Sequence, residues 1–211
     1  MLIAGLSGLL SPGRRSPGLL VLVLPGGTDN SHKPFSPWQP SALRMYPFTW
    51  SLRLRFGRSV RVHQVGYRVY GWNGDDNSPL LPARAALDEI CRRHPGVPVV
   101  ATGPSMGGRV AAHLAADRRV IGVLGLAPWW QFADWRHIQP GARVVAVHGD
   151  ADTRTLAKRT RKGIAELSAL GVDAEFIPVP GGGHAMLDHI GLWQRSALDF
   201  VGERLSALRG A

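Results

Sequence analysis

A serine between closely spaced glycines lies near the middle of the chain, in the stretch Gly-Pro-Ser-Met-Gly-Gly at residues 103–108. An apolar, β-branched run at 97–102 precedes it, and an alanine-rich segment with a helical pattern follows. In a sharp turn from strand to helix, small residues two before and two after a serine permit close packing, and its hydroxyl stands clear of the sheet. This context predicts that Ser105 is a nucleophile.

A serine hydroxyl needs a neighbouring base to remove its proton, and the chain has eight histidines. Five of them lie in expected strands or helices, or in loops without an obvious positioning device: His32, His63, His94, His113 and His137. His184 instead follows the strand expected at 174–179 through Pro-Gly-Gly-Gly. That loop can place it over the carboxyl edge of the sheet, where α/β folds carry their sites. We expect His184 to be the base, the alternative being an ordinary surface-loop histidine.

The base in turn needs a carboxylate that fixes its tautomer and stabilises its charged form. The strand expected at 143–148 ends in His-Gly-Asp-Ala-Asp, so Asp150 and Asp152 compete at the same edge. Asp152 lies two residues farther from the strand and can reach across more easily, although it could also be the N-cap of the next helix. We favour Asp152 as the acid and interpret Asp150 as a turn residue.

Apolar runs alternate with helical patterns, which is typical of a parallel sheet covered by helices on both faces. The six expected strands are residues 19–24, 60–65, 97–102, 120–126, 143–148 and 174–179. The expected helices are residues 47–58, 79–93, 105–117, 153–170 and 187–208. Ser78 is placed to cap the second helix, and the last helix shows one apolar stripe from Ile190 to Leu208.

The order Ser105, Asp152, His184 is that of α/β hydrolases. Together with the serine turn, the His148-Gly-x-x-Asp152 turn and the Gly183-His184 pair, it makes residues 19–208 resemble a compact α/β hydrolase. The similarity is to the dienelactone-hydrolase-like and carboxylesterase or thioesterase branches. It implies an α/β-hydrolase fold with a mostly parallel sheet of about six strands and no substantial cap domain, a catalytic triad of these three residues, and no metal or organic cofactor.

The resemblance also implies an oxyanion hole, with one donor being the amide after the nucleophile, here Met106. The other comes from the loop after an earlier strand. Gly27 in Pro-Gly-Gly-Thr fits that place, although the family often has His-Gly there and the glycines could form a simple turn. We expect Thr28 and three tryptophans that follow strands, Trp72, Trp129 and Trp130, to lie near the substrate. The indoles could equally serve packing.

At 211 residues the chain is expected to form a single domain over 19–211, preceded by a surface segment over 1–18. That segment is apolar and then basic, the reverse of a secretory signal, and no apolar run approaches the roughly 20 residues of a membrane span. The single cysteine, Cys91, indicates a reducing compartment, so we expect a cytoplasmic protein. The oligomeric state stays open.

The net charge of +10 attracts anions in general, yet the arginines are scattered and no nucleic-acid motif is present. We therefore expect no nucleic-acid partner. The resulting hypothesis is a serine hydrolase with an open site, which cleaves small carboxylic esters or thioesters through an acyl-enzyme on Ser105. One alternative is an acyl-CoA thioesterase, for which the excess of arginines would offer a docking surface for the anionic substrate. The other is a non-enzymatic α/β-hydrolase scaffold that binds a small ligand.

Overall fold

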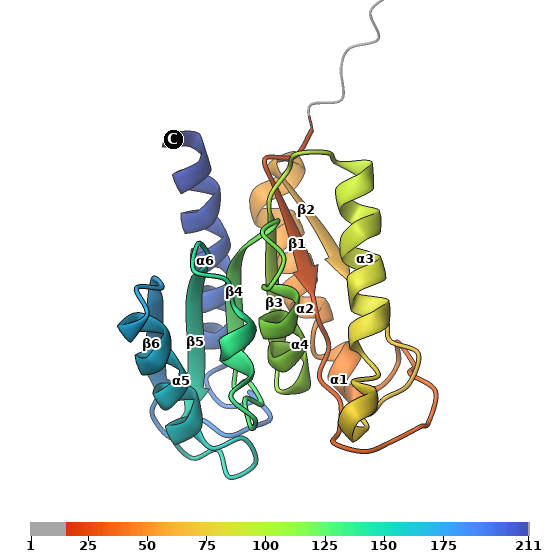
Figure 1. Ribbon diagram of the computed structural model, residues 1–211, viewed down its shortest axis with the longest axis vertical. Helices are drawn as coiled ribbons and strands as arrows, with labels where there is room; N and C mark the ends of the chain where they lie inside the picture. The colour runs from red at the N-terminus through yellow and green to blue at the C-terminus, as the bar shows by residue number, and fades with distance from the viewer. Residues whose placement is uncertain (1–15, 211) are drawn as a thin grey trace, which may run out of the picture.

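A sheet of six parallel strands forms the centre of the molecule (Figure 1), in the order β2-β1-β3-β4-β5-β6. The computed structural model describes residues 16–210, so most of the surface segment expected at 1–18 lies outside the described residues. The strands are β1 (Leu19–Val23), β2 (Val60–Gln64), β3 (Val99–Pro104), β4 (Val120–Leu126), β5 (Arg143–Gly149) and β6 (Ala174–Val179). The six expected strands are thus confirmed to within two residues at each end.

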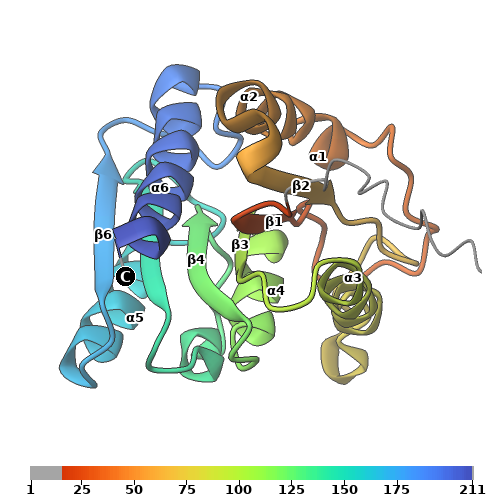
Figure 2. The ribbon, with the colours of Figure 1, turned by 90° about the horizontal axis from the view of Figure 1, so that it is seen from above.

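Helices cover both faces of this sheet (Figure 2), with α2 and α6 on one face and α3, α4 and α5 on the other. The helices are α1 (Pro40–Leu43), α2 (Tyr46–Phe56), α3 (Leu80–Arg93), α4 (Met106–Leu114), α5 (Ala157–Ala169) and α6 (Ile190–Gly210), with 3-10 turns η1 (Gly57–Ser59), η2 (Gly74–Asp76) and η3 (Asp134–His137). Within the described part of the chain, no helix is both long and apolar enough to cross a membrane.

Three details of the expected helices were wrong. Ser78 does not cap α3, because its hydroxyl accepts a hydrogen bond from the Asn73 side-chain amide at 3.0 Å instead. The α5 helix begins at Ala157 rather than at 153, because the preceding residues form a turn around a carboxylate. The two ends of the α6 stripe, Ile190 and Leu208, are exposed, since only the middle of the helix meets the sheet.

The first strand shows why this sheet needs covering on both sides. All five residues of β1 are buried, and successive side chains of a strand point to opposite faces. Leu20 and Leu22 belong to the core cluster that includes α3 and α4, whereas Leu19 and Val21 belong to the cluster that includes α2 and α6. A continuous apolar run is what a central parallel strand requires.

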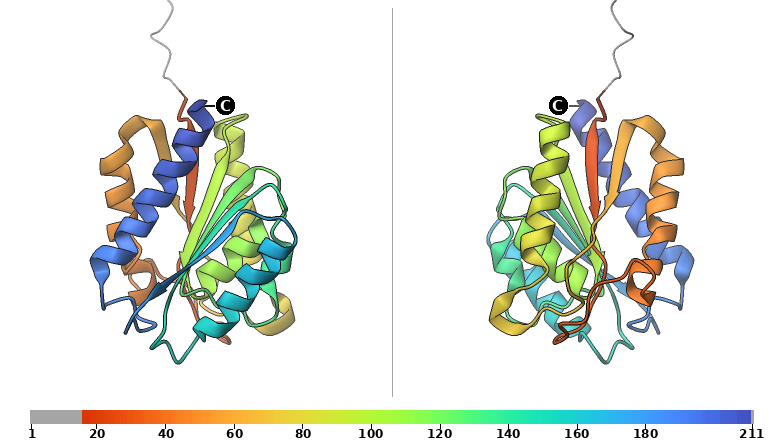
Figure 3. Two further views of the ribbon diagram at one scale, coloured as in Figure 1. Left: turned by 90° about the vertical axis from the view of Figure 1, so that its left-hand side faces the viewer. Right: turned by 90° about the vertical axis from the view of Figure 1, so that its right-hand side faces the viewer.

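The carboxyl ends of the strands meet at one edge of the sheet, at the bottom in Figures 1 and 3. Strand β1 lies between β2 and β3, so the chain leaves β1 toward one face and leaves β3 toward the other. The loops that follow two adjacent strands therefore diverge. Such a switch point is where open α/β sheets carry their ligand sites.

Two glycines hold the β3–α4 turn tightly against the end of β1. A Cβ atom at Gly103 would lie 2.3 Å from the Leu24 carbonyl oxygen, and one at Gly107 would lie 2.0 Å from the same atom. Backbone oxygen cannot move away as a flexible side chain can. These positions therefore accept only glycine without displacement of the backbone.

We expect Gly107→Ala to lower the free energy of unfolding by about 1–3 kcal/mol or more, because the added methyl overpacks a backbone contact. Gly191→Ala in α6 is the matched control, since its nearest neighbour would be the Arg195 guanidinium at 3.6 Å. That helical substitution should be neutral or stabilising by up to about 1 kcal/mol. Urea unfolding of both variants measures the difference, and equal stabilities would contradict the packing argument.

Candidate active site

Ser105 occupies the sharp turn between β3 and α4 in a strained backbone conformation, with φ 50° and ψ −119°. Such positive φ values cost of order 1–3 kcal/mol and need support from the surroundings. The support comes from β4 and its loop: the Ser105 amide donates to the Leu126 carbonyl at 3.0 Å, and the Ser105 carbonyl accepts from the Trp129 amide at 2.9 Å. The hydroxyl is thereby presented at the carboxyl edge.

The structure brings Ser105, His184 and Asp152 together from three separate loops. His184 Nε2 lies 3.1 Å from Ser105 Oγ, and His184 Nδ1 lies 2.8 Å from Asp152 Oδ2. Because Nδ1 faces a carboxylate, which only accepts hydrogen bonds, it carries the ring proton. Nε2 is then free to accept the proton of the serine hydroxyl.

The Asp152 carboxylate is fully buried and surrounded by donors. Its Oδ1 accepts the backbone amides of Arg154 at 2.7 Å and Thr155 at 3.1 Å, while the Thr155 hydroxyl donates to Oδ2 at 2.8 Å. Burial alone would raise the pKa of this carboxyl, but the hydrogen bonds from His148, His184 and Thr155 outweigh it and hold the pKa well below its usual range. One carboxylate thus orders the turn before α5 with one oxygen and faces His184 with the other.

A second histidine, His148, contacts the same carboxylate oxygen and has no exposed side-chain surface. Its Nε2 lies 3.1 Å from Asp152 Oδ2, and its Nδ1 lies 2.8 Å from the Thr160 hydroxyl on α5. In a neutral ring, the protonated Nε2 donates to Asp152 and Nδ1 accepts from Thr160. The sequence reasoning missed the contacts of His148 and Thr155, although His148 stands at the end of a buried strand, four residues before the acid.

Asp150 serves the loop that carries His184. Its carboxylate accepts the Gly181 amide at 2.7 Å. The two loops also pack backbone to backbone, since a Cβ at Gly149 would lie 2.0 Å from the Gly182 carbonyl oxygen. Asp150 is therefore a turn residue, as expected, and it ties the end of β5 to the loop after β6.

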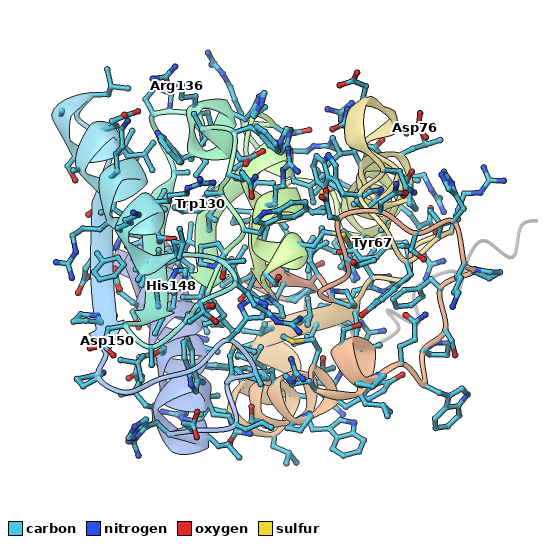
Figure 4. The ribbon with its side chains drawn as sticks, turned by 90° about the horizontal axis from the view of Figure 1, so that it is seen from below. Tyr67, Asp76, Trp130, Arg136, His148 and Asp150 are labelled. Atoms are coloured by element: carbon cyan, nitrogen blue, oxygen red, sulfur yellow. The ribbon has the colours of Figure 1, made fainter. Side chains whose placement is uncertain are left out.

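The loop after β1 runs beside Ser105. A Cβ at Gly26 would lie 3.8 Å from Ser105 Cβ, and one at Gly27 would lie 2.4 Å from Met106 Cε. Among the described residues, neither the Gly27 amide nor the Met106 amide has a backbone acceptor. Figure 4, which views the carboxyl edge, shows Tyr67 across the site from His148 and Asp150. The buried Tyr67 hydroxyl donates to the Pro25 carbonyl at 3.1 Å and steadies this loop.

The four residues expected near the substrate, Thr28, Trp72, Trp129 and Trp130, differ in how deeply they are buried. Trp72 and Trp130 are buried in the core: the Arg109 guanidinium lies 3.7 Å from the Trp72 ring centroid, and the Trp130 indole donates to the Gly108 carbonyl at 3.1 Å. Their packing role, left open by the sequence, is the one these contacts favour. Thr28 is half-buried and joins the Gly27 loop to residues 70–72, its amide donating to the Tyr70 carbonyl at 3.2 Å.

Trp129 is half-buried beside a cavity of about 230 Å³. Residues after β4 and β5 line this cavity: Trp129, Trp130, Gln131, Thr153, Arg154, Thr155, Leu156 and Arg159. Thr155 Oγ1 also lies 3.0 Å from His184 Nδ1, which places the cavity next to the Ser105–His184–Asp152 group. Among the described residues that line it, none is acidic.

The remaining polar groups take structural places. Arg109 and Asp134 form a buried ion pair at 2.7 Å, His113 adds a contact to the same carboxylate, and His137 stacks on His113 with ring centroids 4.0 Å apart. Cys91 is half-buried on α3, where burial raises the pKa of its thiol. Among the residues that the structure describes, no group of His, Cys, Asp and Glu is arranged to hold a metal ion.

Comparison with solved structures places this arrangement in a known fold, although no protein-family model and no curated protein matches the sequence. A serine hydrolase homologue from Coxiella burnetii has a TM-score of 0.65 at 14% identity, with 89% of this chain and 86% of that chain covered. A serine hydrolase without a lid from Xanthomonas campestris has a TM-score of 0.66 at 16% identity, covering 92% and 85%. Est1E from Butyrivibrio proteoclasticus, with ferulic acid bound, has a TM-score of 0.68 at 14% identity, covering 92% of each chain. The chain has the α/β-hydrolase fold.

Proposed function

We propose that the protein is a serine hydrolase that cleaves carboxylic esters or thioesters. The observation that carries this proposal is the continuous hydrogen-bond sequence from Ser105 Oγ to His184 and on to the buried Asp152 carboxylate, with lengths of 3.1 and 2.8 Å. Hydroxyl, imidazole and carboxylate in this order are the parts needed to activate a serine. A non-catalytic scaffold would not need a strained serine facing a base.

In the proposed reaction, Ser105 Oγ attacks the substrate carbonyl carbon while its proton passes to His184 Nε2. The amides of Gly27 and Met106 hold the developing oxyanion, a contribution worth several kcal/mol in acyl-transfer enzymes. His184 then protonates the leaving alcohol or thiol, which departs and leaves an acyl group on Ser105. Water, deprotonated by His184, attacks this acyl-enzyme, releases the acid and restores the serine. Asp152 orients His184 throughout.

The size of the site supports small or medium substrates. The connection between β4 and β5 contains only the short turn η3, so it offers no covering lid. The structural neighbours include Est1E with bound ferulic acid and a thermophilic esterase from Thermogutta terrifontis with bound propionate, which is consistent with ester substrates. The acyl-CoA thioesterase remains the second candidate, because Arg154 and Arg159 line the adjacent cavity without an acidic neighbour there. A cytoplasmic location remains part of the proposal.

Labelling with a fluorophosphonate tests the nucleophile directly. Wild type should be labelled covalently, and Ser105→Ala should lose labelling together with at least about 10³-fold of ester hydrolysis, because the attacking oxygen is gone. The measurement is fluorescence of the labelled band alongside turnover of a soluble p-nitrophenyl ester. Undiminished labelling of Ser105→Ala would contradict the assignment of Ser105 as the nucleophile.

The two aspartates give a matched pair. Asp152→Asn should reduce kcat by about 10⁴-fold, since an amide in place of the carboxylate favours the wrong tautomer of His184. Asp150→Asn should stay within about threefold of wild type, because an asparagine oxygen can still accept the Gly181 amide. Steady-state kinetics with one ester substrate measures kcat for both variants. A larger loss of kcat in Asp150→Asn than in Asp152→Asn would assign the acid to Asp150.

His148 is expected to tune the pH dependence. Its hydrogen bond is one of those that hold the pKa of Asp152 well below the usual range, so Asp152 stays charged in mild acid. His148→Phe removes this donor, so the pKa of Asp152 rises and the carboxylate charge that orients His184 is lost at a higher pH than in wild type. We expect the acidic limb of kcat/KM to move to higher pH and kcat to fall about tenfold. His148→Gln can still donate a hydrogen bond, so its kcat/KM should fall at the same acidic pH as in wild type. If His148→Phe also loses kcat/KM at the wild-type pH, this role of His148 is contradicted.

A further inference from the structure

Residues 30–74 contain no aspartate or glutamate, although the chain has 15 acidic residues. The same stretch has seven basic residues, which are Lys33, Arg44, Arg53, Arg55, Arg58, Arg61 and Arg68. Most of the net charge of +10 therefore originates in this part of the chain, which forms α1, α2 and β2 at one end of the sheet.

The helix in the middle of this stretch is apolar on both of its faces. Phe48 and Leu52 of α2 are buried against the sheet, as the inner face of a surface helix should be. Its outer face carries Trp50, which is 59% exposed, and Leu54, which is 86% exposed. A surface helix normally presents polar residues outward, whereas α2 exposes Trp50 and Leu54 among Arg53 and Arg55.

The exposed apolar side chains continue beyond α2. Trp38 before α1 is 78% exposed, and Leu43 on α1 is 41% exposed. Within α2 the rings of Tyr46 and Trp50, one helical turn apart, stack with their centroids 6.0 Å from each other. We call Trp38, Leu43, Trp50 and Leu54, together with the exposed Arg55 and Arg58 of the same segment, the α1–α2 face. In Figure 3 the α2 helix runs along the outside of the molecule beside α6.

We propose that the α1–α2 face docks on an anionic membrane surface. Tryptophan favours the boundary between hydrocarbon and headgroups, aliphatic side chains favour the acyl layer, and arginines beside them bind anionic lipid. The protein then sits on the membrane without spanning it. The proposal does not depend on the proposed hydrolase function, because none of these residues contacts Ser105, His184 or Asp152.

Charge decides between this partner and a second copy of the chain. A twofold dimer through this face would place two basic, acid-free surfaces opposite each other, and like charges repel. The acidic residues of the adjoining α6 do not reverse that balance: Glu203 is paired with Arg143 and Arg204, and Asp199 shares its groove with Arg55 and Arg209. Single-stranded nucleic acid would use the arginines and tryptophans but gives Leu43 and Leu54 no favourable contact.

Co-sedimentation with vesicles tests the proposal on the full chain. The protein should pellet with phosphatidylcholine vesicles that contain phosphatidylglycerol, much less with phosphatidylcholine alone, and less as salt rises because charges are screened. The double variant Trp50→Ser/Leu54→Ser should bind about tenfold more weakly, since it loses the apolar anchor. Arg58→Gln should bind about fivefold more weakly.

The matched controls lie on the opposite face of the sheet. Leu81→Ser removes a leucine that is 70% exposed on α3, and Lys158→Gln on α5 lowers the net charge by the same amount as Arg58→Gln. Both should bind vesicles like wild type. Circular dichroism and thermal melting report folding for every variant, independently of hydrolase activity.

Three results would overturn the proposal. One is wild-type protein that does not pellet with anionic vesicles, or that pellets equally whether or not the α1–α2 face is altered. Another is a wild-type dimer in light scattering that Trp50→Ser/Leu54→Ser dissociates, which would make a second copy the occupant. The third is stronger binding to a single-stranded oligonucleotide than to vesicles, lost in the same variants.

Discussion

A buried negative charge on Asp152 organises the candidate active site. An uncompensated carboxylate in the interior would be costly, so the chain surrounds it with donors from three elements: the end of β5, the turn before α5 and the loop after β6. Each of those donors is thereby fixed in position. The orientation of His184, and through it the link to Ser105, follows from the need to satisfy this one charge.

A second constraint is the close backbone packing at the switch point of the sheet. The Leu24 carbonyl oxygen lies close to both Gly103 and Gly107, so the loop after β1 packs directly against the turn after β3. This contact holds the loop that contains Gly27 beside the turn that contains Ser105 and Met106. The charge network orders one half of the site and the glycine contact orders the other, and Ser105 stands where the two meet.

The helix α2 differs from the usual surface helix because some of its large apolar side chains face outward. Each helix on the sheet is anchored by apolar side chains that face inward, and α2 in addition exposes a tryptophan and a leucine, Trp50 and Leu54, among basic neighbours. Sequence periodicity alone recognises such a segment as helical but does not say which of its apolar residues find a partner. In the same way, the stripe on α6 was correct for Trp193 to Leu205 and wrong at its ends, where the helix runs past the sheet.

The sequence by itself determined the strands, their parallel arrangement and the order of serine, aspartate and histidine, because these depend on local apolar runs and on glycine-rich turns. Tertiary structure alone decided which polar groups share one carboxylate. His148, Thr155 and Thr160 lie apart from His184 along the chain and meet only because β5, α5 and the loop after β6 converge. It also decided that Trp72 and Trp130 are buried while Trp50 and Leu54 are exposed. Residue type records how much apolar surface a side chain brings, but only packing decides what covers it.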